Sequence, residues 1–290
     1  MVVVFGSINL DLVARVPRIP APGETLAGTG FDVAPGGKGA NQALAARHAG
    51  AHVVMYGATG TDSFADAALL NLASAGVEID VARVPVPTGV ALINVDDRGE
   101  NAITVVAGAN ALARATQVPD ARLGAGTTIL MQLEVPLAQI ESLAARAHAL
   151  GARVVLNAAP ASPLPDELLR NVDVLIVNEH EATICAGGAY RDAAAFLAHM
   201  HKTFAVDCVI TLGARGAMAM DGETPVQVAS PSVDVVDTTG AGDAFAGAFA
   251  AALDAGRTLR DAMTAGARAG ALCCTYRGAQ REAPRSASSG

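Results

Sequence analysis

Tryptophan is absent from this 290-residue chain, and aromatic residues make up only 3% of it. A site that stacks bases on aromatic rings therefore has little to build with. Lysine is also scarce, because Lys38 and Lys202 are the only two. The formal net charge of −8 argues against nonspecific binding to nucleic acid or to an anionic membrane, which needs clustered lysine and arginine. An anionic ligand would need a local site made of backbone amides, a metal ion or one or two cationic side chains.

Cysteine pairs, long apolar runs and histidine clusters are missing as well. The four cysteines, Cys185, Cys208, Cys273 and Cys274, form no CxxC pair, and we interpret them as small hydrophobic residues in the reducing cytosol. No run of about 18 apolar residues is free of glycine and charge, so we expect no membrane-spanning helix. The apolar residues 1–5 lack a basic leader and predict a buried strand instead of a signal peptide. The histidines are scattered, so we expect no zinc site, and the absences together predict a cytoplasmic protein.

What the sequence does contain is an alternation of short apolar strands and alanine-rich helical segments. This rhythm predicts an α/β fold in which helices cover both faces of a mostly parallel sheet. No repeat or linker divides the chain, so we expect a single domain over residues 1–290, with a flexible polar tail at 281–290. The expected strands lie at residues 2–5, 53–56, 127–133, 153–157, 174–177 and 208–212, with a hairpin at 217–220 and 225–228. The expected helices lie at residues 35–49, 62–75, 137–150, 191–201, 244–253 and 259–274.

Two segments, 12–33 and 77–106, break the alternation. The first has two strand-like runs around a proline-rich turn. The second has three strand-like runs in succession, at 77–84, 89–95 and 102–106. We expect these segments to form a small sheet that projects from the main domain.

Polar residues recur where the expected strands end. Asn9 and Asp11 follow the first strand and Glu134 follows another, at the edge of a parallel sheet where ligands bind. Carboxylates accept hydrogen bonds from adjacent hydroxyls, so the three residues together predict a polyol pocket. Taken singly, each also suits a turn or a helix cap.

The stretch from Asp237 to Phe245 carries the strongest chemical signal. A β-type run at 233–236 leads into a glycine turn that opens a helix, and unpaired N–H groups at a helix start bind anions. Gly240 and Gly242 let the backbone approach an anion without a Cβ in the way. A carboxylate at such a site, Asp243, is expected to take a proton from an attacking hydroxyl. The stretch therefore predicts phosphoryl transfer to an alcohol.

A second glycine-rich segment, Gly36 to Asn41, lacks the spacing of a Walker A loop. Its glycines let the backbone wrap a small polar ligand, to which Lys38 and Asn41 supply hydrogen-bond donors. The alternative is an ordinary glycine-rich entry to a helix.

Two further strand ends carry weaker signals. Asn178 and Glu181 are three residues apart and could hold Mg²⁺ through its waters, although a capping box with Asn178 as N-cap explains the pair better when it is taken alone. The segment Thr211 to Gly216 could admit the phosphates or ribose edge of a nucleotide, or could form a plain tight turn.

Five motifs occur in order along the chain: GSINLD at 6–11, PGGKGANQA at 35–43, NEHE at 178–181, TLG at 211–213 and DTTGAGDAF at 237–245. Together they resemble the ribokinase-type (phosphofructokinase B-type) family of carbohydrate kinases over residues 2–280. The resemblance implies a three-layer α/β/α sandwich with a small β-sheet lid over the sugar. It also implies a homodimer formed through that lid.

The resemblance assigns roles to individual residues. Asp243 would be the catalytic base, the backbone of Gly240, Ala241 and Gly242 the anion hole, and Glu181 the organiser of Mg²⁺. The residues implied to hold the sugar are Asn9, Asp11, Gly37, Lys38, Asn41, Glu134 and Asp243 itself. The residues implied to face the nucleotide are Asn178, Thr211, Gly213, Gly216 and Gly242. The residues implied for a monovalent cation are Asp237, Thr239, Cys273, Tyr276, Gly278 and Glu282, the last standing where the family usually offers a serine hydroxyl.

The resemblance therefore implies that ATP phosphorylates the 5-hydroxyl of D-ribose to give D-ribose 5-phosphate, with Mg²⁺ required and K⁺ as activator. The alternatives are a kinase for another small sugar or a nucleoside (deoxyribose, fructose or adenosine) and a non-catalytic, sugar-sensing protein on the same scaffold. The scarcity of aromatic residues favours a sugar over a nucleoside, because a nucleoside needs apolar surface for its base.

Overall fold

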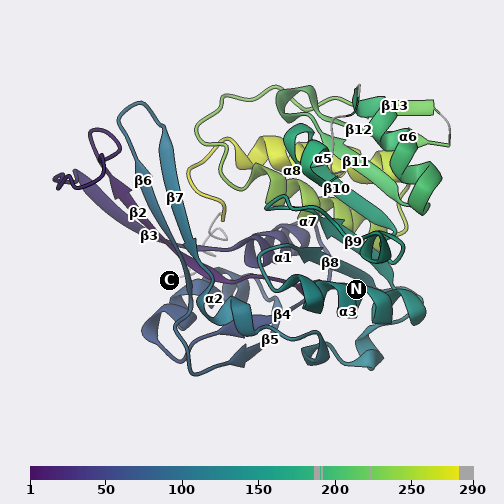
Figure 1. The fold of residues 1–290 in the computed structure, drawn as a ribbon, viewed down its shortest axis with the longest axis horizontal. Coiled ribbons are helices and arrows are strands. Elements are labelled where there is room, and N and C mark those ends of the chain that lie inside the picture. Colours follow the sequence, from purple (N-terminus) through teal and green to yellow (C-terminus); the bar gives the residue numbers. More distant parts are fainter. Residues whose placement is uncertain (186–189, 191, 223, 281–290) are drawn as a thin grey trace, which may run out of the picture.

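A nine-stranded sheet forms the centre of the molecule (Figure 1). The computed structural model describes residues 1–185, 190, 192–222 and 224–280. The strand order is β13-β12-β11-β10-β9-β8-β1-β4-β5, in which β12 pairs antiparallel with both β11 and β13 and the other pairs are parallel. The strands are β1 (Val2–Phe5), β4 (Val53–Thr59), β5 (Glu78–Arg83), β8 (Thr128–Gln132), β9 (Arg153–Asn157), β10 (Val174–Asn178), β11 (Asp207–Thr211), β12 (Ala217–Asp221) and β13 (Thr224–Val228).

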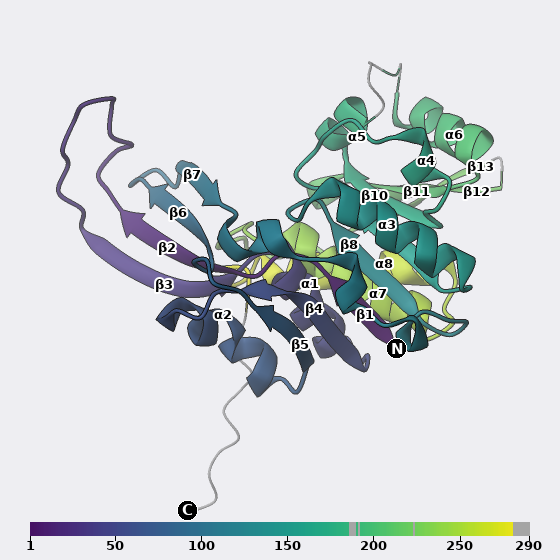
Figure 2. The ribbon, with the colours of Figure 1, turned by 60° about the horizontal axis from the view of Figure 1, so that its bottom comes forward.

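Helices cover both faces of this sheet, because successive side chains of each buried strand point to opposite faces. Val2 and Val4 of β1 pack in one core, whereas Val3 and Phe5 pack in the other. The first core includes α1 (Lys38–His48), α2 (Ser63–Ser74), α7 (Ala241–Asp254) and α8 (Leu259–Cys273). The second includes α3 (Leu137–Ala149), α4 (Asp166–Leu169), α5 (Glu179–Cys185) and α6 (Ala193–Phe204). The predicted three-layer α/β/α arrangement is confirmed (Figure 2).

Four 3₁₀ turns complete the connections that the structure describes. They are η1 (Gly108–Leu112), η2 (Ala115–Gln117), η3 (Asp120–Arg122) and η4 (Gly213–Arg215). Among the described residues, no helix is long and apolar enough to cross a membrane. All four cysteines are free thiols, and only Cys274 is not fully buried. The expected tail at 281–290 lies outside the described residues.

A small four-stranded sheet projects from the body, as predicted (Figures 1 and 2). Its order is β3-β2-β6-β7, with β2 and β6 parallel. Its strands are β2 (Asn9–Arg15), β3 (Gly30–Gly36), β6 (Gly89–Val95) and β7 (Asn101–Val106). Because β2 begins at Asn9 and β3 ends at Gly36, two of its strands are rooted beside the start of α1.

The assignment of residues 77–84 to the small sheet is wrong. Glu78–Arg83 is β5, which pairs in parallel with β4 at the edge of the large sheet. Its Ile79 and Val81 pack against the core that contains α2. The segment follows a helix that returns the chain to the same sheet, so it continues the α/β alternation that the sequence pattern seemed to break.

Candidate active site

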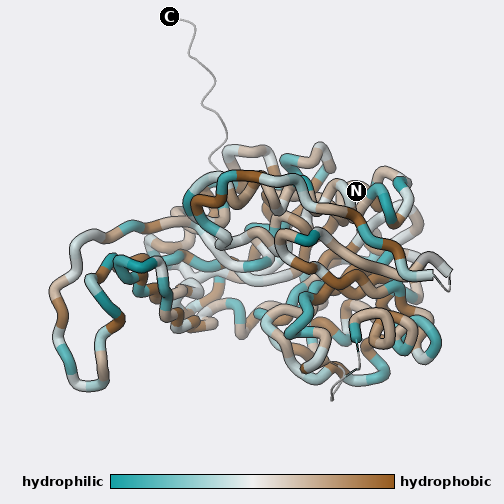
Figure 3. The backbone as a smooth tube through the Cα atoms, turned by 90° about the horizontal axis from the view of Figure 1, so that it is seen from above, coloured by the Kyte–Doolittle hydropathy of each residue, from teal (hydrophilic) through white to brown (hydrophobic). Residues whose placement is uncertain are grey.

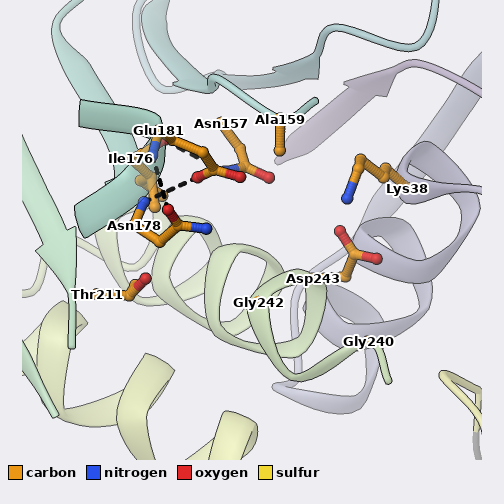
Figure 4. Close-up of a pocket in the computed structure, with 10 residues that line it drawn as sticks. All are labelled: Lys38, Asn157, Ala159, Ile176, Asn178, Glu181, Thr211, Gly240, Gly242 and Asp243. Atoms are coloured by element: carbon orange, nitrogen blue, oxygen red, sulfur yellow. Dashed lines mark hydrogen bonds between the residues drawn. The ribbon is translucent and has the colours of Figure 1, made fainter. Parts of the chain in front are cut away.

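The polar residues at the strand ends meet at one edge of the large sheet. The register pairs Gln132 with Asn157 and Asn178 with Thr211, so these side chains belong to neighbouring strands at the same level. Asn157, Asn178 and Thr211 border a cavity of about 170 Å³ (Figure 4). Its lining residues are Lys38, Asn157, Ala159, Ile176, Asn178, Glu181, Thr211, Gly240, Gly242 and Asp243. The cavity therefore lies where the strand ends meet the first turn of α7.

The segment before α7 differs from the prediction. Residues 233–236 form no strand, and the side chains of Val235 and Val236 are exposed. The amide of Val236 donates to the carbonyl of Cys274 at 2.8 Å, so the segment runs beside the end of α8. The glycine turn is as expected, because Gly240 has a φ of 76°, which favours glycine.

The first turn of α7 offers unpaired backbone donors to the cavity. Helix α7 starts at Ala241, earlier than expected. The amide of Ala241 donates to Thr238 O at 3.2 Å and that of Ala244 to Gly240 O at 2.8 Å. Within the described chain, the amides of Gly242 and Asp243 have no acceptor. Of the predicted anion hole, the Gly242 amide is thus available, whereas the Ala241 amide is engaged in the turn.

Asp243 is buried, with 6% of its surface exposed, and both of its carboxylate oxygens accept hydrogen bonds. Asn41 Nδ2 donates to Oδ2 and Gln42 Nε2 donates to Oδ1, each at 2.9 Å. The side chain of Lys38 points toward Asp243 from the same side of the cavity (Figure 4). The negative charge of Asp243 raises the pKa of Lys38, and although burial opposes this, Glu134 and Glu181 add to the rise. Lys38 therefore stays protonated beside the carboxylate.

The predicted sugar residues surround the root of the small sheet. Glu134 Oε2 accepts hydrogen bonds from Ser7 Oγ at 2.6 Å and from the Lys38 amide at 3.1 Å, which ties the end of β1 to the start of α1. Burial, followed by the charges of Glu134 and Asp243, raises the pKa of Asp11 to about 6. Gly36 pairs opposite Asn9, and a Cβ there would lie 2.3 Å from the Asp11 carboxylate oxygens. The structure thus brings the acidic residues of the predicted pocket together.

Asn110 is a residue that sequence reasoning missed. It is 1% exposed, and its Nδ2 donates to Asn9 Oδ1 at 2.7 Å. It also accepts from the Ile8 amide at 2.9 Å and donates to Ile8 O at 3.1 Å. Asn110 thus holds the oxygen end of the Asn9 side chain, which leaves the Nδ2 hydrogens of Asn9 to donate to a ligand. No local pattern marks Asn110, since its partners lie about a hundred residues away in the chain.

A second cavity, of about 410 Å³, adjoins the first and shares Thr211 and Gly242 with it. Most of its lining side chains are apolar, and they include Val233, Val235 and Phe245. The predicted nucleotide residues Gly213 and Gly216 also line it. Gly216 has a φ of 93°, and a Cβ there would meet Val228 O, so this turn requires glycine. The site therefore has a polar end at Asp243 and an apolar end beyond Gly242.

Asn178 and Glu181 form the capping box that the sequence favoured. The Asn178 amide donates to Glu181 Oε2 and the Glu181 amide donates to Asn178 Oδ1, both at 2.8 Å. Burial raises the pKa of Glu181. In the described part of the chain, no group of three or more His, Cys, Asp or Glu side chains could hold a metal ion. Glu181 lines the cavity opposite Asp243 (Figure 4), and a single carboxylate suits Mg²⁺ that keeps waters and binds substrate phosphates.

The residues predicted for a monovalent cation also converge. Asp237 accepts hydrogen bonds from the Thr239 amide at 2.9 Å and the Gly278 amide at 2.8 Å. Burial opposes ionisation of Asp237, but these two amides, with the side chain of Thr239 and the charge of Arg277, together lower the pKa. The Cys273 thiol donates to Thr239 O at 3.4 Å, and Cys273 O accepts from the Tyr276 amide at 3.5 Å. Glu282 lies outside the described residues.

Comparison with known proteins places these features in a family. The family model described as pfkB family carbohydrate kinase matches residues 1–285. The ribokinase of Haemophilus influenzae is 38% identical, over 97% of this chain and 94% of that protein. The solved ribokinase of Thermotoga maritima superposes with a TM-score of 0.90 at 30% identity, covering 98% and 96% of the two chains. The ribokinase of Arabidopsis thaliana, complexed with ribose and ATP, superposes with a TM-score of 0.85 at 31% identity, covering 96% and 93%.

Proposed function

Because the chain belongs to the pfkB family of carbohydrate kinases, we propose that it transfers the γ-phosphoryl group of ATP to the 5-hydroxyl of D-ribose. The observation that carries this proposal is the buried carboxylate of Asp243, which shares one cavity with the first-turn backbone of α7. A relative with 38% identity that is named ribokinase, and a structural neighbour complexed with ribose and ATP, support the choice of sugar and donor.

The reaction follows from this arrangement. Asp243 accepts the proton of the 5-hydroxyl while that oxygen bonds to the γ-phosphorus and the bond to the β–γ bridging oxygen breaks, which releases ADP. The Gly242 amide and the Lys38 ammonium stabilise the charge on the transferring group. In this proposal Asn9, Asp11, Asn41 and Glu134, with the backbone of Gly37, hold the other hydroxyls.

The two adjoining cavities suit a nucleotide whose phosphates point toward Asp243. The apolar cavity takes the base; Gly213 and Gly216 line it, Thr211 lies where the two cavities meet, and Asn178 lines the polar one. Mg²⁺, held through water by Glu181, would neutralise phosphate charge when bound. We propose that K⁺ binds beside Asp237 and activates the enzyme. The Asp237 carboxylate already accepts hydrogen bonds from backbone amides in both segments of that site, 237–239 and 273–278.

A coupled phosphorylation assay over ribose, deoxyribose, fructose and adenosine, with and without K⁺, tests the proposal. We expect the highest kcat/KM for ribose and a higher rate with K⁺. A sugar or nucleoside that ranked well above ribose would overturn the assignment of the substrate. Absence of turnover with every acceptor would favour the sugar-sensing alternative.

We further propose a homodimer formed through the small sheet. The strand register places the apolar Ile103 and Val105 on the face that carries Asp11, and both are about half exposed. Seen from above, the projecting sheet mixes polar and apolar segments, whereas the most apolar segments concentrate in the body (Figure 3). A second copy covering the Asp11 face would bury Ile103 and also shield the sugar.

Ile103→Lys should give a monomer in analytical ultracentrifugation, whereas Phe31→Lys, on the opposite face, should leave the dimer intact. A dimeric Ile103→Lys variant would exclude this face.

Closure of the small sheet over the sugar is a second part of the proposal, because water that reached the γ-phosphate would hydrolyse ATP. Limited proteolysis of residues 12–33 should slow when ribose is added. Equal cleavage with and without ribose would count against closure. We also propose a cytoplasmic location, in accord with four free thiols.

A further inference from the structure

The carboxylate of Asp243 is held by two consecutive residues of a different helix. Asn41 and Gln42 of α1 each donate one side-chain N–H, one to each carboxylate oxygen, at 2.9 Å. Hydrogen bonds to a carboxylate are stronger than those between neutral groups. The two amides therefore fix the direction of the carboxylate.

Gln42 has no polar group left for a substrate. It is fully buried, and its Nε2 donates to both Asp243 Oδ1 and Asn157 Oδ1, each at 2.9 Å. Its Oε1 accepts from Gln132 Nε2 at 2.7 Å. Because an amide NH₂ has two hydrogens, both donors of Gln42 are occupied. Gln132 and Asn157 are paired on neighbouring strands, so the large sheet anchors Gln42.

Asn41 is engaged differently. Its Oδ1 accepts from Gln280 Nε2 at 2.9 Å, and one Nδ2 hydrogen goes to Asp243, which leaves the other for a sugar hydroxyl. Removing Asn41 would therefore disturb both sugar binding and the carboxylate. Gln42 is the residue that reaches Asp243 without also facing the sugar.

Helix packing sets the distance between Gln42 and Asp243. Gly247 lies one turn after Asp243 on α7, and a Cβ there would be 2.4 Å from Gln42 O and 2.6 Å from Ala45 Cβ. The backbones of α1 and α7 therefore touch at this point. The close approach holds the side chain of Gln42 within hydrogen-bond reach of the carboxylate.

We propose that Gln42 is a positioning residue for phosphoryl transfer: it orients the carboxylate of Asp243 without contact with the sugar. The inference rests on the proposed function, in which Asp243 accepts the proton. It predicts that a change at Gln42 lowers kcat and leaves KM for ribose almost unchanged, because the sugar is bound by other residues. A residue that only stabilised the fold would change neither the split between kcat and KM nor the pH profile.

The test measures kcat, KM for ribose and ribose binding by calorimetry across the pH range. Gln42→Leu should lower kcat by about 10- to 100-fold, with ribose affinity within about twofold of the parent. The loss should appear in kcat and not in KM for ribose, because the leucine cannot donate to the carboxylate of Asp243. Gln139→Leu is the matched control, since Gln139 accepts a hydrogen bond from the Ala115 amide at 2.9 Å and does not line the cavity. It should leave kcat and the pH profile unchanged.

Gln42→Glu keeps the shape of the side chain and guards against a leucine variant that fails to fold. The introduced carboxyl group would repel Asp243 when ionised and donate a hydrogen bond to it when protonated. We expect the activity deficit of this variant to shrink as the pH falls. If either folded variant kept the parental kcat and pH profile while Asp243→Asn was inactive, the inference would fail and the proposed function would stand. An active Asp243→Asn variant would instead overturn the proposed function itself.

Discussion

The floor of the site and the small sheet that projects beside it are built in opposite ways. In the floor, Asp243, Asn41, Gln42 and Asn157 are buried polar residues joined by hydrogen bonds. In the small sheet, apolar side chains such as Phe31 are exposed. Its ion pairs are exposed too: in the pair that links β2 to β3, the side chains of Arg15 and Asp32 are 40% and 57% exposed. Buried networks are rigid and costly to break, whereas exposed pairs contribute little.

This difference indicates that the two regions serve different purposes: the floor suits the chemical step, and the small sheet suits movement. The floor holds a carboxylate in one orientation, which proton transfer requires. The small sheet has little burial beyond its root, so it can shift or meet a second copy without disturbing that orientation. Asp11 stands at the boundary, because it belongs to β2 but its pKa is raised by burial and by the charges of Glu134 and Asp243.

Asp243→Asn should produce the largest effect on the floor. The amide keeps the shape of the carboxylate but cannot accept the proton, so we expect kcat to fall by about 10²- to 10⁴-fold. Ribose binding measured by calorimetry should persist, because the other sugar residues are untouched. Turnover close to that of the parent would remove Asp243 as the base.

Asp11 should link sugar affinity to pH. Its pKa is about 6 in the folded chain against an ordinary value of 3.8, so the folded state binds the extra proton between these two pH values. The contribution of Asp11 to the free energy of unfolding is therefore greatest at acidic pH. It declines by as much as about 3 kcal/mol as the pH rises through about 6. Asp11→Asn should raise the free energy of unfolding at neutral pH, and the gain should vanish below about pH 4 in denaturant titrations.

The same variant should weaken ribose binding by about 10- to 100-fold at neutral pH, since the ionised carboxylate accepts hydrogen bonds more strongly than an amide does. For the parent protein, KM for ribose should rise as the pH falls below about 6, where Asp11 becomes protonated. A KM that did not change with pH in the parent would show that the charge of Asp11 has no part in binding the sugar.

The sequence predicted those residues of the floor that lie beside recognisable glycine motifs. Asp243 follows a glycine turn, and Lys38 and Asn41 lie in a glycine-rich helix start. Gln42 carried no such mark, since its partners Gln132 and Asp243 lie 90 and 201 residues away. Only the packing of α1 on α7 and the register of β8 with β9 bring these side chains together.

The errors in the fold have the same origin. Three of the four residues at 233–236 are valines, yet the segment runs beside the end of α8 and forms no strand. Residues 78–83 have strand propensity and do form a strand, but propensity does not say which sheet receives it. Local patterns predicted the type of most elements, whereas long-range pairing decided their place.

Gly247→Ala should loosen the floor without removing any of its polar groups. The new Cβ would press on Gln42 O and Ala45, so α7 must move from α1, at a cost of about 1–3 kcal/mol in the free energy of unfolding. We expect kcat to fall by about tenfold, since Gln42 and Asn41 would no longer reach Asp243 at hydrogen-bond distance. Gly124→Ala is the control, because a Cβ at Gly124 would have open space around it and no heavy atom within 4 Å. Equal kcat values for the two variants would contradict a role for the close helix contact.

Asp32→Asn should have the smallest effect, because it alters only an exposed pair of the small sheet. Arg15 donates to Asp32 Oδ2 through Nε at 3.0 Å and through Nη2 at 2.9 Å, but water screens both groups. We expect the free energy of unfolding to change by less than about 1 kcal/mol, and kcat to stay within about twofold of the parent. A kcat loss as large as that of Gly247→Ala would mean that the small sheet and the floor are energetically coupled. In that case the buried network alone would not set the orientation of Asp243, and movement of the sheet would have to be part of the chemical step.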